Sequence, residues 1–493
     1  MARPDFEISN NCVAAATGEA AGSHVLSNWE AGLSFEMNKL VGPMKRRSSS
    51  LLMFSGLVAL AAGPALSQIS PMGVPAPAPT TSQQRPAIQP APLPPGAGAP
   101  GTAQPTQPVV PVPPPLPPAI WDVPAALELA TFINSLGSEG LNPADYDAPG
   151  LMTAIQTGNI PLISQAATQR FNMVSTDLAL GHVRKPGRIA WFLVDNDLNP
   201  QKQDALMRAA IAQHSVTTTL TGLLPTHPQY AALKNALAVT PASDTAKRNR
   251  IRLNLDRWRW LPRDLGEKYI IVNVPGFHAT LVENGVNRWK QRAIAGSIKT
   301  PTPQLSATAV GVMLNPSWEV PPSITHEVVG KPGFVPVRKD GKIIRWSQPP
   351  GPTNALGQVK FVMYNPHNIY LHDTNARSRF DSRMRALSHG CIRTQHIMNL
   401  ATELLGDDGG EWTADKIQAQ LATGKSKQAN FVKPLPVYIV YFSSAALNDG
   451  RIVDYQDLYG RDAKALAALQ MKDGGASLAP PPKPKPADQV AAR

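Results

Sequence analysis

The stretch from residue 68 to residue 119 limits what this chain can fold into more than any other. Of the 50 prolines in 493 residues, 18 fall between Pro71 and Pro118, among Ala, Gln, Gly and Thr with almost no charge. Such a composition buries too little apolar surface to offset the entropy of the chain. We therefore predict an extended, partly polyproline II linker over 68–119. A proline-rich recognition motif is the alternative, and in either case the folded domains must follow this stretch.

The segment before the linker has the layout of a secretory signal peptide. Three basic residues, Lys45-Arg46-Arg47, precede the apolar run from Leu51 to Gly63, and Ala65-Leu66-Ser67 provides small residues for cleavage. The apolar run is too short to span a bilayer as an ordinary transmembrane helix. We predict a signal peptide over 44–67, by the general secretory or twin-arginine route. Residues 1–43 are then a spurious or disordered extension, and no integral membrane span is expected after cleavage.

The formal net charge of +12 favours an anionic partner such as nucleic acid, anionic lipid or an anionic cell-wall polymer. The basic residues are scattered and mixed with acidic ones, and neither zinc-finger spacing nor a recognition-helix signature is found. Nucleic acid is therefore not an expected partner. The charge alone does not decide between the remaining classes.

Residues 120–245 carry apolar side chains at helical spacing and predict an all-α domain, with helices over 123–136, 160–180, 201–214 and 228–238. The next stretch, 247–263, interleaves arginines with two tryptophans. Because Ile251, Leu255 and Trp258 lie on one helix face, we expect a helix docked against the following domain, with its arginines mostly in solvent.

The pattern changes after Pro262 to short β-branched and aromatic runs at 269–274, 280–282, 359–364 and 437–442, bounded by turn residues. Few helices separate these runs, and one helix is expected over 396–405. The fold class predicted is α+β, an all-α domain followed by a mostly antiparallel β-sandwich-like body. The last residues, 466–493, are predicted to be a disordered tail.

Cys391 is the candidate nucleophile. The other cysteine, Cys12, lies upstream of the signal segment, so an exported chain would hold one unpaired thiol, either inert and buried or reactive. An acyl-transfer site needs a thiol, a base and oxyanion donors. His372 ends a strand-like run and can be the base, amides near Gly390 can form the oxyanion hole, and Arg393 can hold a carboxylate or favour the thiolate.

These residues resemble a known signature. His372, fifteen intervening residues and then Ser388-His389-Gly390-Cys391-Ile392-Arg393 is similar to the motif of the bacterial L,D-transpeptidases with a YkuD-type catalytic domain. Stretches such as Asn315-Pro316-Ser317-Trp318 and Asp454-Tyr455-Gln456-Asp457 resemble the larger, periplasmic YcbB-like subgroup with a helical scaffold domain. The resemblance covers residues 120–465. It departs near 319–350, where only a short cap insertion fits, and no separate peptidoglycan-binding repeat is seen.

The resemblance implies that Cys391 attacks the third residue of a tetrapeptide stem, expels D-Ala, and passes the acyl group to a diaminopimelate amine, giving a 3→3 cross-link. His372 is then the general base, oriented by the Asp373 carbonyl, and His389 supports the site. Gly390 serves the oxyanion hole, and the residues implied in substrate binding are Arg393, Tyr370 and Ser388. Neither a metal nor another cofactor is expected. The implied location is the periplasm, and the implied partners are peptidoglycan stem peptides and possible cell-wall synthesis proteins.

Several alternatives remain open on the sequence. The thioester can pass to a lipoprotein lysine or to water instead of a stem peptide, and a non-catalytic wall-binding protein is a further class. A cysteine peptidase of the Cys-then-His type fits poorly, because His372 precedes Cys391. The predicted domains are an extension (1–43), a signal peptide (44–67), a linker (68–119), a helical scaffold domain (120–245), a catalytic domain (246–465) and a tail (466–493).

Overall fold

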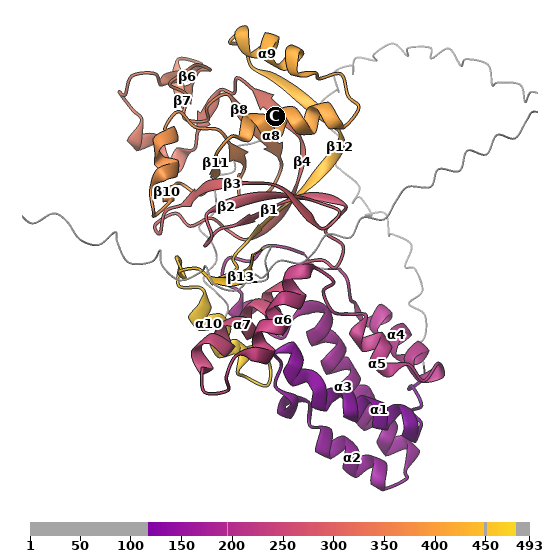
Figure 1. Ribbon diagram of the computed structural model, residues 1–493. Helices are drawn as coiled ribbons and strands as arrows, with labels where there is room; N and C mark the ends of the chain where they lie inside the picture. Colours follow the sequence, from indigo (N-terminus) through magenta and orange to yellow (C-terminus); the bar gives the residue numbers. More distant parts are fainter. Residues whose placement is uncertain (1–116, 195, 448–450, 480–493) are drawn as a thin grey trace, which may run out of the picture. The chain divides into compact units, whose positions relative to one another are not determined.

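The computed structural model describes residues 117–194, 196–447 and 451–479. The predicted extension, the signal peptide and nearly all of the linker therefore lie outside the described residues. The described part falls within one compact unit, in which a helical region precedes a β-rich region (Figure 1). Within these residues no helix is long and apolar enough to cross a membrane.

The helical region begins after polar caps that the sequence supplies. Asp122, Asn159 and Asn199 each accept a hydrogen bond from a main-chain N–H in the first turn of the following helix, and each first turn contains a proline, which lacks the N–H that a helix start leaves unpaired. The helices are α1 Val123–Ser135, α2 Ala148–Gln156, α3 Ile160–Leu180, α4 Pro200–Ala212, α5 Val216–Thr221, α6 Pro228–Val239 and α7 Thr245–Trp258. Helices α1, α3, α4, α6 and α7 agree closely with the predicted ranges, whereas α2 and α5 had no predicted range.

The β-rich region is built on one nine-stranded sheet, in which β2 pairs with both β1 and β3 and so closes the sheet on itself. Six strand pairs are antiparallel and three are parallel, which confirms the mostly antiparallel prediction. Closure leaves the short β10, which pairs only with β3, as the remaining edge strand, and it replaces the sandwich that we expected. The strands are β1 Lys268–Asn273, β2 His278–Glu283, β3 Val286–Gly296, β4 Leu305–Leu314, β8 Val359–Met363, β9 Leu371–His372, β10 Ala386–Ser388, β11 Ile392–Thr394 and β12 Lys427–Val440.

Two helices belong to the β-rich region, α8 Ile397–Asp407 and α9 Ala414–Ala422. The apolar face of α8 contributes Ile397, Leu400 and Leu404 to the main core, together with side chains from most strands of the closed sheet. The predicted helix after Cys391 is therefore present, and it packs the segment that follows Cys391 against the core.

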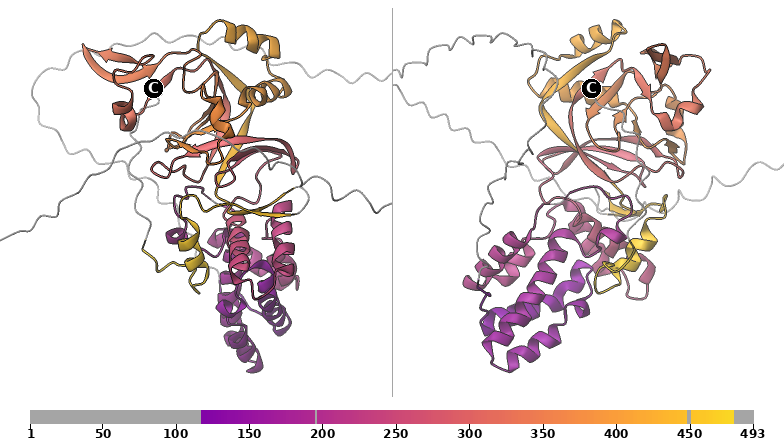
Figure 2. Two further views of the ribbon diagram at one scale, coloured as in Figure 1. Left: turned by 60° about the vertical axis from the view of Figure 1, so that its left-hand side comes forward. Right: turned by 180° about the vertical axis from the view of Figure 1, so that it is seen from behind.

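The predicted short cap insertion forms a separate three-stranded sheet (Figure 2). Its strands are β5 Trp318–Val320, β6 Val335–Lys339 and β7 Lys342–Gln348, with a 3₁₀ helix, η4, over Pro322–Glu327. A small cluster of its own, around Val320, Ile324 and Val328, holds it together. The cap insertion thus folds as a small unit whose stability depends on a few apolar contacts.

The C-terminal part is more ordered than we expected. After the β13 Ser444–Ala446 and β14 Ile452–Asp454 hairpin, α10 covers Asp462–Leu469 and buries Ala468 and Leu469. Residues 471–479 continue along the helical region, where the Arg184 N–H donates to the Gly474 carbonyl at 2.8 Å. The prediction of a disordered tail from residue 466 is therefore wrong up to residue 479, because these apolar side chains pack on the helical region.

The arginines of α7 also differ from the prediction. Arg257 of α7 is buried because the chain after β14 returns to cover this helix, and Arg259, directly after the helix, is buried against Glu139 and Tyr230. Arg257 donates to Asp462 at 2.7 Å, and Arg259 lies 3.4 Å from the buried carboxylate of Asp256. The helical periodicity of this segment could not predict the burial of Arg257, because its partner Asp462 lies 205 residues later in the sequence.

Candidate active site

Two neighbouring strands bring the predicted nucleophile and base together. β9 and β11 are parallel, with Leu371 opposite Ile392 and His372 opposite Arg393. Leu371 and Ile392 belong to the core, so alternation places the side chains of His372 and Arg393 on the other face. Cys391 directly precedes β11. No hydrogen bond joins His372 to Cys391 in the described part of the chain, and the Cys391 Sγ lies 3.5 Å from the Asn368 carbonyl oxygen.

His372 is held in one tautomer. It is buried, and its Nδ1 lies 2.5 Å from the carbonyl oxygen of Asp373. A carbonyl only accepts, so Nδ1 carries the proton and Nε2 keeps the lone pair. Burial, followed by the charge of Arg393 and more weakly that of Lys360, lowers the pKa of His372 to about 3 against the opposing effect of the Asp373 hydrogen bond. At neutral pH the imidazole is therefore neutral and can accept a proton.

The Cys391 thiol is partly exposed, and its pKa is raised by burial. Hydrogen bonding with Tyr370 and the charges of Lys360 and Arg393 oppose that effect. Tyr370 has a strongly raised pKa, because of its own burial first and of Cys391 second, so its hydroxyl keeps its proton. The resting thiol is thus protonated, and attack on a carbonyl requires that a base remove the proton.

The loop before Cys391 is fixed by its own hydroxyl groups. The Ser388 Oγ donates to the Cys391 carbonyl at 2.6 Å and accepts from the Gly390 N–H at 3.1 Å, while the Thr302 hydroxyl donates to the Gly390 carbonyl at 2.7 Å. Gly390 has a φ of +122°, which favours glycine. Ser388 is buried and engaged within the loop, so it shapes the loop and does not face a ligand.

The oxyanion prediction changes in detail as a result. Gly390 offers no free N–H, because Ser388 accepts it. The Cys391 N–H has no hydrogen-bond partner among the described residues, so it is the donor that remains available at this loop. Gly390 contributes its backbone conformation, which sets the direction of that N–H.

The remaining predicted site residues lie around this loop. His389 is exposed, and its Nε2 lies 3.2 Å from Glu327 of η4, so it contacts the cap insertion and not the thiol. Arg393 is half-buried, and its buried Nε has no hydrogen-bond partner in the described ranges. Lys360 on β8 is a residue that the sequence did not indicate. The one sequence feature that could have indicated Lys360 is that it is the single charged residue in the otherwise apolar strand β8.

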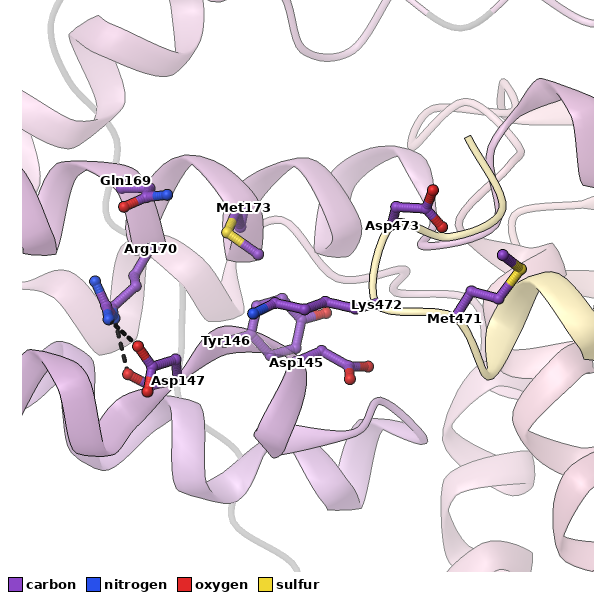
Figure 3. A pocket seen from close by; sticks show the side chains of 9 residues that line it. All are labelled: Asp145, Tyr146, Asp147, Gln169, Arg170, Met173, Met471, Lys472 and Asp473. Carbon is purple, nitrogen blue, oxygen red and sulfur yellow. Dashed lines mark hydrogen bonds and ion pairs between the residues drawn. The ribbon is translucent and has the colours of Figure 1, made fainter. Parts of the chain in front are cut away.

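A separate cavity of about 550 Å³ lies in the helical region, away from Cys391 (Figure 3). It is lined by α3, by the segment around Tyr146 and by Lys472 after α10. Asp147 and Arg170 form an ion pair at its wall, and it contains neither histidine nor cysteine. Among the described residues no group of histidine, cysteine or acidic side chains could hold a metal ion.

Comparison with known proteins identifies two family domains in the chain. Residues 267–425 match the family model of the YkuD L,D-transpeptidase catalytic domain, and residues 118–237 match that of a Scaffold domain. A Haemophilus influenzae protein named "Putative L,D-transpeptidase" is 29% identical over 240 residues, which are 43% of this chain and 48% of the relative. The chain therefore spans about half the length of that curated relative.

Solved structures give a weaker likeness. An L,D-transpeptidase from Mycobacterium smegmatis aligns at 14% identity and a TM-score of 0.20, covering 35% of this chain and 58% of that one. The catalytic domain of the Enterococcus faecium L,D-transpeptidase, acylated by ertapenem, aligns at 14% identity and a TM-score of 0.20, covering 36% and 99%. Scores this low support no further comparison. On the family matches, the chain carries a YkuD-type L,D-transpeptidase catalytic domain behind a helical Scaffold domain.

Proposed function

We propose that this protein is a peptidoglycan L,D-transpeptidase of the periplasm that forms 3→3 cross-links through a thioester on Cys391. The observation that carries the proposal is the parallel pairing of β9 with β11, which sets His372 beside the Cys391 loop in a domain that matches the transpeptidase family. The neutral His372 imidazole, with the lone pair on Nε2, can act as the base, and the protonated Cys391 thiol becomes the nucleophile once it loses its proton.

In the first step, the Cys391 sulfur attacks the carbonyl carbon of the third residue of a tetrapeptide stem, and the thiol proton passes to His372 Nε2. The Cys391 N–H, which has no partner among the described residues, donates to the oxyanion that develops. Collapse of this intermediate breaks the peptide bond to the terminal D-Ala. The leaving amine takes the proton from His372, which leaves a thioester on Cys391 and a neutral imidazole.

In the second step, the side-chain amine of a diaminopimelate on another stem attacks the thioester. His372 accepts a proton from this amine and returns it to the departing sulfur, so the thiol and the neutral imidazole are restored. The guanidinium of the half-buried Arg393 suits a carboxylate of the stem. The expected signal peptide, proline-rich linker and net charge of +12 support work on an anionic mesh outside the inner membrane.

The test uses the full chain with Cys12→Ala, which leaves Cys391 as the single thiol. This protein and its Cys391→Ala counterpart are incubated with disaccharide-tetrapeptide, and the products are identified by mass spectrometry. We expect dimers that lack one D-Ala, and we expect none with Cys391→Ala. Tripeptide monomers alone would instead indicate transfer to water, and unchanged substrate would refute an enzyme of this substrate class.

A second measurement separates acylation from the choice of acceptor. A carbapenem should add its mass to the Cys12→Ala protein and not to the Cys391→Ala variant. If the adduct forms but no dimer appears, a lysine-ended peptide is added as an alternative acceptor. Transfer to that peptide would point to attachment of a lipoprotein. Absence of any adduct would contradict a reactive Cys391.

A further inference from the structure

Lys360 lies in one row with two residues of the active site. On β8 it pairs with His372 of β9, which in turn pairs with Arg393 of β11. Residues directly opposite each other on neighbouring strands project to the same face of a sheet. The neighbours of Lys360 in sequence, Val359 and Phe361, both belong to the core. The lysine side chain therefore projects from the same face as His372 and Arg393.

The ammonium group of Lys360 is held on an aromatic ring that reaches the nucleophile. Its Nζ lies 4.7 Å from the centroid of the Tyr370 ring, a cation–π contact. The Tyr370 ring packs against that of His372 with centroids 5.6 Å apart, and Tyr370 and Cys391 each shift the pKa of the other. The contact with the Tyr370 ring thus holds the Lys360 charge near both Cys391 and His372, the donor and the acceptor of the transferred proton.

Lys360 has no carboxylate partner to explain its position. The side chain is half-buried, and within the described ranges its ammonium group forms neither an ion pair nor a hydrogen bond. Glu319 of β5 influences it from a distance, but Glu319 is exposed and paired with Arg345 at 3.1 Å. A partly desolvated ammonium group with no counter-ion costs stability, and such groups gather at functional sites. The charge that Lys360 meets at this face is the one that develops on Cys391.

We propose that Lys360 is a positioning residue of the active site, whose ammonium group, fixed on the Tyr370 ring, stabilises the Cys391 thiolate and disfavours the His372 imidazolium. The proposal rests on Cys391 as the nucleophile of the proposed function, and it is independent of the amine that accepts the acyl group. In this arrangement a preorganised cation stabilises the sulfur as its proton leaves for His372 Nε2. The same charge speeds the onward transfer of that proton to the leaving amine.

The electrostatic surroundings agree with this role. The charges of Lys360 and Arg393 both lower the pKa of Cys391 against the larger effect of burial. Both charges also lower the pKa of His372. The groups that face the sulfur are therefore Tyr370 from the segment before β9, Lys360 from β8 and Arg393 from β11.

The test measures the thiolate directly. The full chain with Cys12→Ala reacts with 4,4′-dithiodipyridine between pH 6 and pH 11, and the released thiopyridone gives the rate at each pH. Loss of one nearby positive charge in Lys360→Met should move the midpoint of the profile up by about one pH unit. Below the midpoint, the thiolate fraction falls about tenfold while its nucleophilicity rises about threefold, so the rate falls roughly threefold. Above both midpoints the variant should be about threefold faster, and the two curves cross.

Matched variants separate charge from packing. Lys360→Arg keeps the charge and should return the midpoint to the value of the parent protein. Lys268→Met removes another half-buried lysine of the same closed sheet, one paired with Glu283 and Asp407, and should leave the profile unchanged. Lys360→Gln is a second neutral variant in case Lys360→Met does not fold. An unmoved midpoint in a folded neutral variant, or a uniform fall in rate with no crossing, would overturn the proposal.

The two proposals fail in different ways. The disulfide reaction uses no stem peptide, so normal profiles without tetrapeptide turnover would refute the proposed function alone. Normal cross-linking by the parent protein, together with an unmoved midpoint in Lys360→Met, would refute the role of Lys360 alone.

Discussion

Asp256 of α7 should be one of the least replaceable carboxylates in the chain. It is fully buried. Its Oδ1 accepts from the His182 N–H at 2.7 Å and lies 3.4 Å from Arg259, and its Oδ2 accepts from the Val183 N–H at 3.0 Å and the Trp260 indole N–H at 2.8 Å. Each carboxylate oxygen thus meets two donors, and none of the contacts offers an acceptor.

The Asp256→Asn substitution keeps the shape of the side chain but leaves one oxygen acceptor in place of two. The amide has one oxygen, so its NH₂ group must face two of the donors, and two buried N–H groups lose their partner. Each such loss costs about 1–3 kcal/mol. Arg259, also fully buried, loses its counter-charge as well. Breaking one half of a buried pair costs about 3–5 kcal/mol, and we expect the total destabilisation to fall in that range.

Thermal unfolding at pH 7, followed by tryptophan fluorescence, measures this effect, because Trp260 is part of the cluster. For a domain of about 200 residues, the expected loss lowers Tm by roughly 10 °C. Asp204→Asn is the control: Asp204 forms a half-exposed ion pair with Arg208 at 2.7 Å, and its loss should cost less than about 1 kcal/mol. Equal Tm values for the two variants would refute the argument.

Three further predictions concern the loop and the histidines. Gly390→Ala places a Cβ 3.2 Å from the Ile369 side chain at a φ of +122°, a strain of about 1–3 kcal/mol, so carbapenem acylation of Cys391 should slow by roughly tenfold or more; an unchanged rate by mass spectrometry would contradict this. Because the pKa of His372 is lowered to about 3, chiefly by burial, acylation by the free enzyme should show no histidine step between pH 5 and pH 8, and an acid limb near pH 6.5 would contradict that assignment. Burial lowers the pKa of His182, but the hydrogen bond and charge of Asp177 outweigh it and raise the net value. Stability from His182 is thus fully present below its unfolded pKa of about 6.5 and is lost as pH rises through the folded pKa. The Tm difference between the parent protein and His182→Gln should be larger at pH 5.5 than at pH 8.5, and equal differences would exclude this linkage.

The sequence predicted those features that depend on local pattern. Helix α3 was expected over 160–180 and has those bounds, because an Asn cap and an early proline define its start. β3 and β4 were not predicted. The first half of β3 is exposed and polar, and β4 mixes small residues with Leu, Val and Met, so neither shows the apolar alternation of a half-buried strand.

Long-range register was beyond the sequence pattern. Cys391 and His372 were predicted from their motif, whereas Lys360 gains its place only because β8 pairs with β9 at one register position. The burial of Arg257 has the same origin, since its partner Asp462 comes from a helix that starts 205 residues later. Contacts of this kind depend on strand register and on where the C-terminal segment packs, and the local hydrophobic periodicity of the sequence predicts neither.

The C-terminal segment also links the helical region to the loop before Cys391 through a chain of hydrogen bonds. Arg257 of α7 holds Asp462, while the neighbouring Arg461 donates to the Thr302 carbonyl at 2.8 Å. The Thr302 hydroxyl in turn donates to the carbonyl of Gly390, the residue before the nucleophile. Because these contacts are buried, their donors and acceptors cannot be exchanged for water at no cost. The conformation of the Cys391 loop therefore depends on residues 457–462, and a catalytic unit that ended before them would lose the hydrogen bonds that hold Thr302 in place.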